Sequence, residues 1–180
     1  MSEPLPFDPI AEARRQWGLH GWDDAAPVMA VVTSVMRVQQ LLVARADTTL
    51  RPFDLTFARY EVLMLLSFSS RGALPLGKIG ERLQVNPASV TNAIDRLEEQ
   101  GLVERVPNPD DGRGTLARLT DEGRARSSAA TKAMNAEVFV DLGVDADGVS
   151  QLFELLRDVR RAAGDFAEGG VRDAGGSTGR

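Results

Sequence analysis

One stretch, residues 74–120, constrains the fold of this chain more than any other, because it reads as a helix, a turn, a second helix and a two-stranded hairpin. The second helix is predicted to begin at Pro87. Asn86 before it is a good N-cap, and proline lacks an N–H that would have no helical partner at that position. Gly101 marks its end, because glycine is the commonest residue just past a helix C-terminus.

The predicted second helix has two unlike faces. One face is apolar at helical spacing and consists of Val90, Ala93, Ile94 and Leu97. The opposite face begins with small and hydrogen-bonding side chains and consists of Ala88, Ser89, Asn92, Asp95, Arg96 and Glu99. Such a face suits a helix whose N-terminal half enters the major groove of DNA and touches base edges.

The hairpin that follows has apolar strands and a polar tip. Its strand residues are Leu102, Val103 and Val106, then Leu116, Ala117 and Leu119. Proline and glycine in the intervening PNPDDGRG open a loop. Asp111 lies two residues before Arg113 there, and an acidic side chain can fix a guanidinium so that it reaches into a narrow minor groove.

These residues resemble the winged helix-turn-helix of the MarR family of transcriptional regulators. The matching motifs are RLEEQGLVERV after the recognition helix, Asp111-Gly112-Arg113 in the wing and RLTDEGR after it. The family usually has a second arginine or similar residue at Gly112 and often a serine at Gly114, so the wing departs from the pattern while its Asp–x–Arg pair is intact. A looser resemblance covers about residues 25–163.

The resemblance implies a mainly α fold with a small β-wing, in which N- and C-terminal helices form a dimerisation region around a winged helix-turn-helix. We expect an N-terminal extension with an extra helix at 1–23, dimerisation helices at 24–53 and 121–163, the DNA-binding domain at 54–120 and a disordered tail at 164–180. It also implies a homodimeric repressor that a small molecule releases from a pseudo-palindromic operator.

Helix boundaries outside the winged stretch follow from caps and apolar periodicity. Asp23 or Asp24 is predicted to cap a helix that runs to about Leu50, and Thr56 a helix of about 57–69. Asp121 and Glu122 are predicted to open a helix that runs to about Leu142. Asp145 is predicted to start the last helix, whose apolar stripe consists of Val149, Leu152, Phe153, Leu156 and Val159.

Six residues are the predicted DNA contacts. Ser89 and Asn92 face base edges, Thr91 and Arg96 hold phosphate or flank the groove, and Asp111 orients Arg113 toward the minor groove. Four further cations are candidates for backbone contacts or simply solvated charges: Lys78, Arg82, Arg105 and Arg118.

The effector site is predicted from the resemblance, which implies a pocket between the dimer helices and the winged domain. Its candidate residues are Trp17, Arg37, Arg59, Tyr60 and Glu61. Trp17 in the N-terminal extension resembles a tryptophan of the urate-responsive branch, but Ala93 stands where that branch has an arginine. Another small aromatic or carboxylate-bearing effector therefore fits better. The alternative is that Trp17, His20 and Trp22 only anchor a helix to the dimer core.

Composition limits which other classes of protein the chain can belong to. The chain has no cysteine, so disulfides and thiolate sites are excluded, and its single histidine has no G-x-S-x-G segment to complete a catalytic triad. We therefore expect no enzyme, no metal and no cofactor. With no uncharged apolar run near 18 residues and no secretory signal, a cytoplasmic protein without a membrane span is predicted.

Net charge leaves a second function open. The chain carries a formal charge of −5, and residues 71–120 contain as many acidic as basic side chains. A winged-helix module that binds protein, without specific DNA binding, is therefore the alternative to a DNA-binding regulator.

Overall fold

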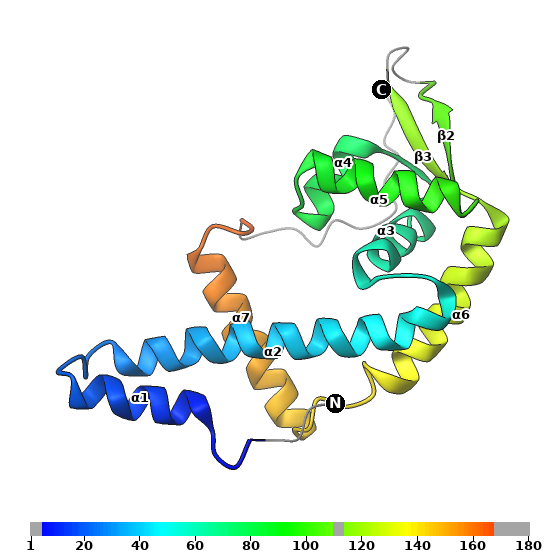
Figure 1. Cartoon of the computed structure of the whole chain (residues 1–180). Helices are drawn as coiled ribbons and strands as arrows, with labels where there is room; N and C mark the ends of the chain where they lie inside the picture. The colour runs from blue at the N-terminus through cyan, green and yellow to red at the C-terminus, as the bar shows by residue number, and fades with distance from the viewer. Residues whose placement is uncertain (1–4, 110–113, 168–180) are drawn as a thin grey trace. The chain divides into compact units, whose positions relative to one another are not determined.

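The computed structural model describes residues 5–109 and 114–167 and shows a mainly α chain with a small antiparallel sheet (Figure 1). The described residues form, in chain order, α1 (Pro9–Leu19), α2 (Ala26–Leu50), the 3-10 turn η1 (Arg51–Phe53), α3 (Phe57–Ser67), β1 (Ala73–Pro75), α4 (Leu76–Leu83), α5 (Pro87–Glu99), β2 (Val103–Pro107), β3 (Thr115–Leu119), α6 (Asp121–Glu137) and α7 (Ala146–Ala162). The predicted fold class is confirmed. The tail predicted to be disordered lies mostly outside the described residues.

The chain divides into two compact units, Met1–Val140 and Asp141–Arg180. The first unit has a core formed where α3, α4, α5 and the sheet meet the end of α2 and one side of α6. Its largest fully buried side chains are Leu50, Leu63, Leu66, Ile79, Ile94, Leu97, Leu102, Val103 and Met134. Apolar residues spaced three and four apart on each helix converge there, which fixes the rotation of each helix about its axis.

The sheet has one more strand than the sequence predicted. The β2–β3 hairpin is present, with Glu104 opposite Arg118, and β1 pairs with the other edge of β3 to give the order β1-β3-β2. β1 is only three residues long and ends in proline, so it carries no alternating pattern that would have indicated a strand. β1 lies between α3 and α4 in the chain, so its pairing with β3 connects the helix-turn-helix to the hairpin.

α1 ends in a glycine motif that turns the chain back along α2. Gly21 has φ +78°, the N–H of Trp22 donates to the carbonyl of Trp17 at 2.9 Å, and the Gly21 N–H donates to that of Gly18 at 3.0 Å. The rings of Trp17 and Trp22 meet edge to face with centroids 5.3 Å apart. An apolar contact between these two positions commonly accompanies this helix end, so both tryptophans have a structural role at the corner.

α2 begins without the predicted aspartate cap. Ala25 occupies the cap position and makes no side-chain hydrogen bond, so the prediction that Asp23 or Asp24 caps the helix is wrong. The chain enters α2 directly from the turn after α1, since Trp22 already accepts hydrogen bonds from the N–H groups of Ala25 and Ala26. Thr56, in contrast, caps α3 as predicted, and its hydroxyl accepts from the Arg59 N–H.

α2 exposes many apolar side chains, which at helical spacing cover more than one face. They are Val28, Val31, Val32, Val35, Met36, Val38 and Leu41. By length and mean hydropathy alone, the helical segment Ala26–Phe53 qualifies as a membrane span, with a hydropathy of 1.4. The sequence predicts no membrane span because Arg37 interrupts the run of apolar residues in this segment. Mean hydropathy over a window can be high even when a charged residue interrupts the run. A helix with an apolar surface that its neighbours in the single chain, α1 and α6, leave uncovered passes the same test.

α6 is shorter than predicted. Thr120 caps it, and Asp121 and Glu122 lie in its first turn, as expected, but it ends at Glu137 rather than near Leu142. Beyond that point the Asp141 carboxylate accepts from the Gly143 N–H at 2.7 Å, and Gly143 has φ +81°. This local turn competes with the helix for the same backbone.

The second unit contains α7. The predicted cap is confirmed, because Asp145 Oδ1 accepts from the Gly148 N–H at 2.8 Å. No residue of α7 is buried in the chain, and the predicted stripe of Val149, Leu152, Phe153, Leu156 and Val159 is exposed.

Gly123→Ala is expected to lower the free energy of unfolding by about 1–3 kcal/mol, the usual cost of overpacking a core. A Cβ at Gly123 would lie 2.1 Å from the Leu102 carbonyl oxygen and 2.8 Å from Leu119 Cδ1. Gly77→Ala is the matched control in α4, because a Cβ there meets no described atom within 4 Å and alanine favours a helix. Denaturant unfolding compares the two variants. A Gly123→Ala chain as stable as the wild type would contradict this packing.

Candidate nucleic-acid interface

α5 is bounded at both ends by the interactions that the sequence predicted. Asn86 Oδ1 accepts from the Ser89 N–H at 2.9 Å, and Pro87 begins the helix. At the other end Gly101 has φ +69° and donates to the Glu98 carbonyl, and the Leu102 N–H donates to that of Leu97, both at 2.9 Å. The helix therefore has a defined length and a defined exit into β2.

Burial of one side of α5 presents the other side to solvent. Val90, Ile94 and Leu97 are at most 2% exposed, which confirms the predicted core face. Ser89 and Asn92 are exposed on the first turns of the opposite side. A helix held in this way can enter a groove without losing contact with its own core.

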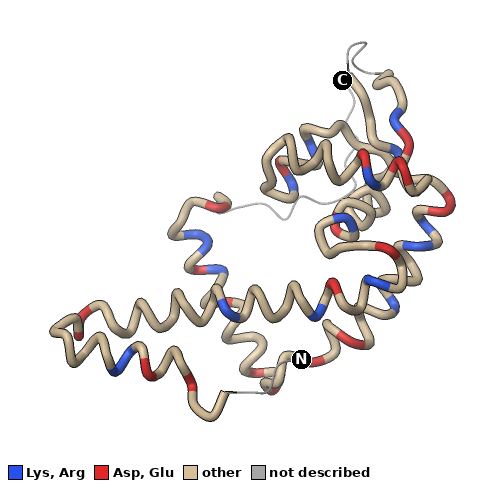
Figure 2. Tube along the Cα trace, in the orientation of Figure 1, with Lys and Arg blue, Asp and Glu red and all other residues tan. Residues whose placement is uncertain are grey.

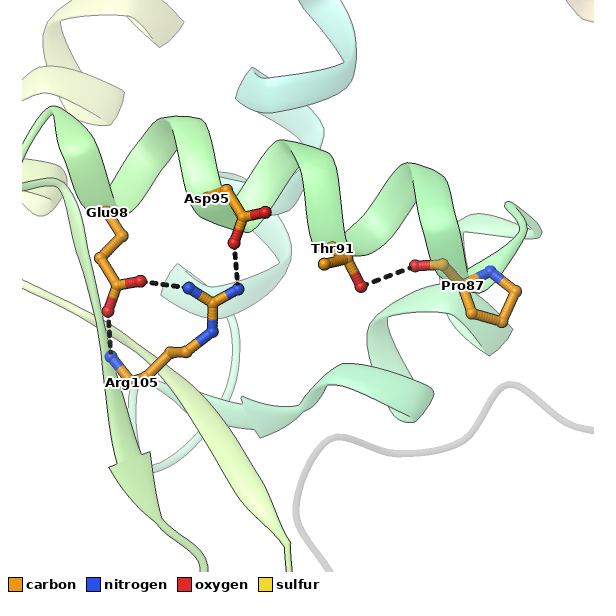
Figure 3. Close-up of polar contacts among 5 residues, drawn as sticks. All are labelled: Pro87, Thr91, Asp95, Glu98 and Arg105. Carbon is orange, nitrogen blue, oxygen red and sulfur yellow. Dashed lines mark hydrogen bonds and ion pairs between the residues drawn. The ribbon is translucent and has the colours of Figure 1, made fainter.

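Two of the predicted contact residues on α5 already have partners within the helix. The hydroxyl of Thr91 donates to the Pro87 carbonyl at 3.0 Å (Figure 3), so it would have to turn away before donating to a phosphate. Arg96 pairs with Glu99 at 2.9 Å, with both side chains more than 60% exposed. A surface pair of this kind contributes at most about 1 kcal/mol, so Arg96 can leave it readily.

Arg105 on β2 lies between two acids of α5 (Figure 3). Its Nη2 is 2.5 Å from Asp95 Oδ1, its Nη1 pairs with Glu98 Oε2, and its backbone N–H donates to Glu98 Oε1 at 3.2 Å. Hydrogen bonding to Asp95, and then to Glu98, raises the pKa of the Arg105 guanidinium above its usual value. Arg105 is predicted to be either a backbone contact or a solvated charge, and the structure excludes the solvated charge, because Arg105 joins the hairpin to α5. Nothing local signals the contact, because the two acids precede Arg105 by ten and seven positions.

The charges around α5 are mixed. Arg118 faces Glu104 across the sheet at 3.4 Å, whereas Lys78 and Arg82 on α4 are exposed and have no ion pair among the described residues. Figure 2 shows basic and acidic residues interspersed over α4, α5 and the sheet. Among the described residues, basic and acidic positions are therefore mixed along this part of the chain.

The wing tip is closed at its base. The Asn108 N–H donates to the Gly114 carbonyl at 2.9 Å, just beyond the paired ends of β2 and β3. The predicted contacts Asp111 and Arg113 lie outside the described residues, so their roles stay predictions.

The candidate effector residues do not come together in one chain. Trp17 lies on α1, which runs beside the first half of α2, whereas α3 lies at the far end of α2 (Figure 1). Arg37 is exposed and donates to Gln40 at 3.3 Å. The pocket between the dimer helices and the winged domain therefore stays a prediction.

The three α3 candidates have different environments. Tyr60 is 6% exposed, and its hydroxyl lies 3.0 Å from Thr131 Oγ1, so it joins α3 to α6 as a core residue. Arg59 Nε donates to the Thr56 hydroxyl at 3.3 Å. Glu61 is the one acid among the five candidates, and partial burial raises the pKa of its carboxyl.

Comparison with known proteins identifies the family. The family model described as MarR matches residues 55–115. MarR of Escherichia coli is 33% identical over 112 residues, which cover 61% of this chain and 76% of MarR. The chain belongs to the MarR family. The regulator YhbI of Bacillus subtilis is 38% identical over 77 residues. These residues cover 43% of this chain and 49% of YhbI, so the chain spans about half the length of YhbI.

Solved structures of MarR-family regulators share the fold. Sco5413 of Streptomyces coelicolor is 51% identical, with a TM-score of 0.72 over 79% of this chain and 99% of that one. A mutant of Escherichia coli MarR, solved in complex with operator DNA, is 28% identical, with a TM-score of 0.69 over 75% of this chain and 96% of that one. The predicted membership of the MarR family is confirmed.

Asn86→Ala is expected to lower the free energy of unfolding by about 1 kcal/mol, because the Ser89 N–H at the start of α5 loses its acceptor. Asn86→Ser is the control, since serine is an equally good cap. Thermal unfolding of both variants measures the effect, and equal melting temperatures for wild type and Asn86→Ala would show that the cap contributes nothing.

Proposed function

We propose that this MarR-family regulator is a homodimeric, cytoplasmic repressor that binds a pseudo-palindromic operator and leaves it when a small ligand binds. The observation that carries the proposal is the exposed α5 face, which begins with Ser89 and Asn92 beside a closed β-hairpin. A helix next to a wing can enter a major groove while the wing reaches the neighbouring minor groove. The structure of a mutant of the related MarR from Escherichia coli has been solved in complex with operator DNA.

The dimer is proposed from apolar surface that the single chain leaves uncovered. α2 exposes a valine-rich surface with members such as Val31 and Val35, and α7, in its own unit, exposes Leu152 and Phe153. Apolar patches of this size mark contacts with another surface. We propose a second copy of the chain, rather than lipid, as the partner of α2. A two-fold dimer then presents two copies of α5 to two half-sites.

Release by a ligand follows if the two copies of α5 change their separation. A small aromatic or carboxylate-bearing molecule near Arg59 and Glu61 would lie at the start of α3, directly after the segment that joins α2 to the winged part. A coupling of about 1–3 kcal/mol changes DNA affinity about 5- to 150-fold, which is enough for a switch. We propose no catalytic role, and in the part of the chain that the structure describes no group of three His, Asp or Glu residues could hold a metal.

The test is binding of the purified chain to duplex DNA from the region upstream of its own gene, at two salt concentrations. We expect tight binding that weakens steeply with salt, since phosphate contacts release counterions. Arg113→Ala is expected to cost about 1–3 kcal/mol of binding free energy by removing the predicted minor-groove contact.

Arg15→Ala is the matched control. It removes an exposed arginine that pairs with Glu12 on α1, away from the helix-turn-helix, and is expected to leave binding nearly unchanged. A folded dimer that binds no upstream fragment would instead favour a protein-interaction module, which the paired charges around α5 also allow.

A further inference from the structure

The ion cluster formed by Arg105, Asp95 and Glu98, hereafter the Arg105 cluster, lies between the two elements proposed to contact DNA. Asp95 and Glu98 project from one flank of α5, and Arg105 meets them from β2, at the root of the wing (Figure 3). Glu104, next to Arg105, points to the other face of the strand and pairs with Arg118, as alternation requires. The cluster therefore lies in the angle between the recognition helix α5 and the wing.

That angle is where a DNA strand would pass. If α5 occupies a major groove and the hairpin tip the adjacent minor groove, the sugar-phosphate backbone that separates the two grooves crosses the space between α5 and β2. A guanidinium at this position is well suited to a phosphate, which it can bind with two parallel N–H bonds.

In the free chain, however, both ends of this guanidinium are engaged by carboxylates. The cluster combines one positive and two negative charges, so it presents a net negative charge to an approaching phosphate. All three side chains are partly exposed, with 28% for Arg105, 50% for Asp95 and 40% for Glu98, so DNA can reach them. Since exposed ion pairs are individually weak, a phosphate can compete for the arginine.

We propose that Asp95 and Glu98 are positioning residues that hold Arg105 away from the DNA backbone and thereby limit the affinity of the regulator for DNA. This inference rests on the proposed function. It assigns to the two acids a role opposite to that of a DNA contact: they weaken binding to any phosphate backbone, so that specific affinity depends more on the α5 face and the wing tip. The device restrains non-specific binding without removing the arginine.

The inference predicts a gain of function. The double substitution Asp95→Asn with Glu98→Gln is expected to tighten binding to the upstream duplex about five-fold, from loss of repulsion and release of Arg105. The slope of log affinity against log salt is expected to steepen by about 0.9, the value for one further phosphate contact. A purely structural role for the acids would change stability without steepening the slope.

Three matched variants make the test specific. Adding Arg105→Gln to the double variant is expected to abolish the gain and the steeper slope. Arg105→Gln alone is expected to weaken binding while leaving the slope unchanged, because Arg105 does not contact phosphate in the wild type. Glu122→Gln removes a negative charge that pairs with Arg126 on α6, outside the helix-turn-helix and the hairpin, and is expected to change affinity less than two-fold. Thermal unfolding checks that each variant is folded.

Several outcomes would overturn the inference. They are unchanged or weaker binding by the double variant, a gain that persists without Arg105, an equal gain from Glu122→Gln, or a shallower slope for Arg105→Gln alone. Failure of the proposed function is distinguishable, because the wild type and every variant would then leave the duplex unbound.

Discussion

Burial of Val90, Ile94 and Leu97 fixes how α5 is turned about its axis, and the rest of the interface depends on that rotation. Each buried side chain contributes about 1.5–3 kcal/mol, so turning the helix to present another face would cost several kcal/mol. The cap at Asn86 and the glycine turn at Gly101 fix where the helix begins and ends. As a result Ser89 and Asn92 face outward, and β2 leaves at an angle that brings Arg105 under the helix.

The electrostatics of this surface differ from those of a simple DNA-binding protein. Arg96, Arg105 and Arg118 each have a carboxylate partner, so the winged part carries cations without a net positive field. Such a surface attracts DNA weakly at long range and depends on contacts at short range. Together with the formal charge of −5, this is expected to limit binding to arbitrary DNA, and we propose that discrimination comes from the α5 face and the wing.

Local signals in the sequence predicted what short-range chemistry determines. The caps at Asn86, Thr56 and Asp145, the core face of α5 and the hairpin all follow from residues within one or two turns of each other. β1 could not be predicted in the same way, because a three-residue strand forms only when β3 is already there to pair with it. The end of α6 was misplaced because an aspartate turn at Asp141 competes with a helix that apolar spacing alone would extend.

The interactions that the sequence did not reveal are those between elements. The contact of Arg105 with Asp95 and Glu98 needs both the glycine turn and the strand register. Tyr60 is a candidate ligand residue by resemblance, and its contact with Thr131, 71 positions away, has no signal in the sequence. Trp17 and Trp22 are predicted either to stack on a ligand or to anchor a helix, and the edge-to-face contact of their rings at the corner between α1 and α2 supports the structural role. The resemblance to a family was visible in the sequence. The contacts that polar and aromatic residues make with other elements were visible only in the structure.

In the proposed complex, two copies of α5, each beside its wing, bind one DNA site together. A hydroxyl-radical footprint of the purified regulator on the upstream duplex tests it most directly. We expect two symmetric protected segments whose centres are separated by about one helical turn, roughly 10 base pairs, with further protection in the flanking minor grooves. A single protected segment, or protection without two-fold symmetry, would contradict it.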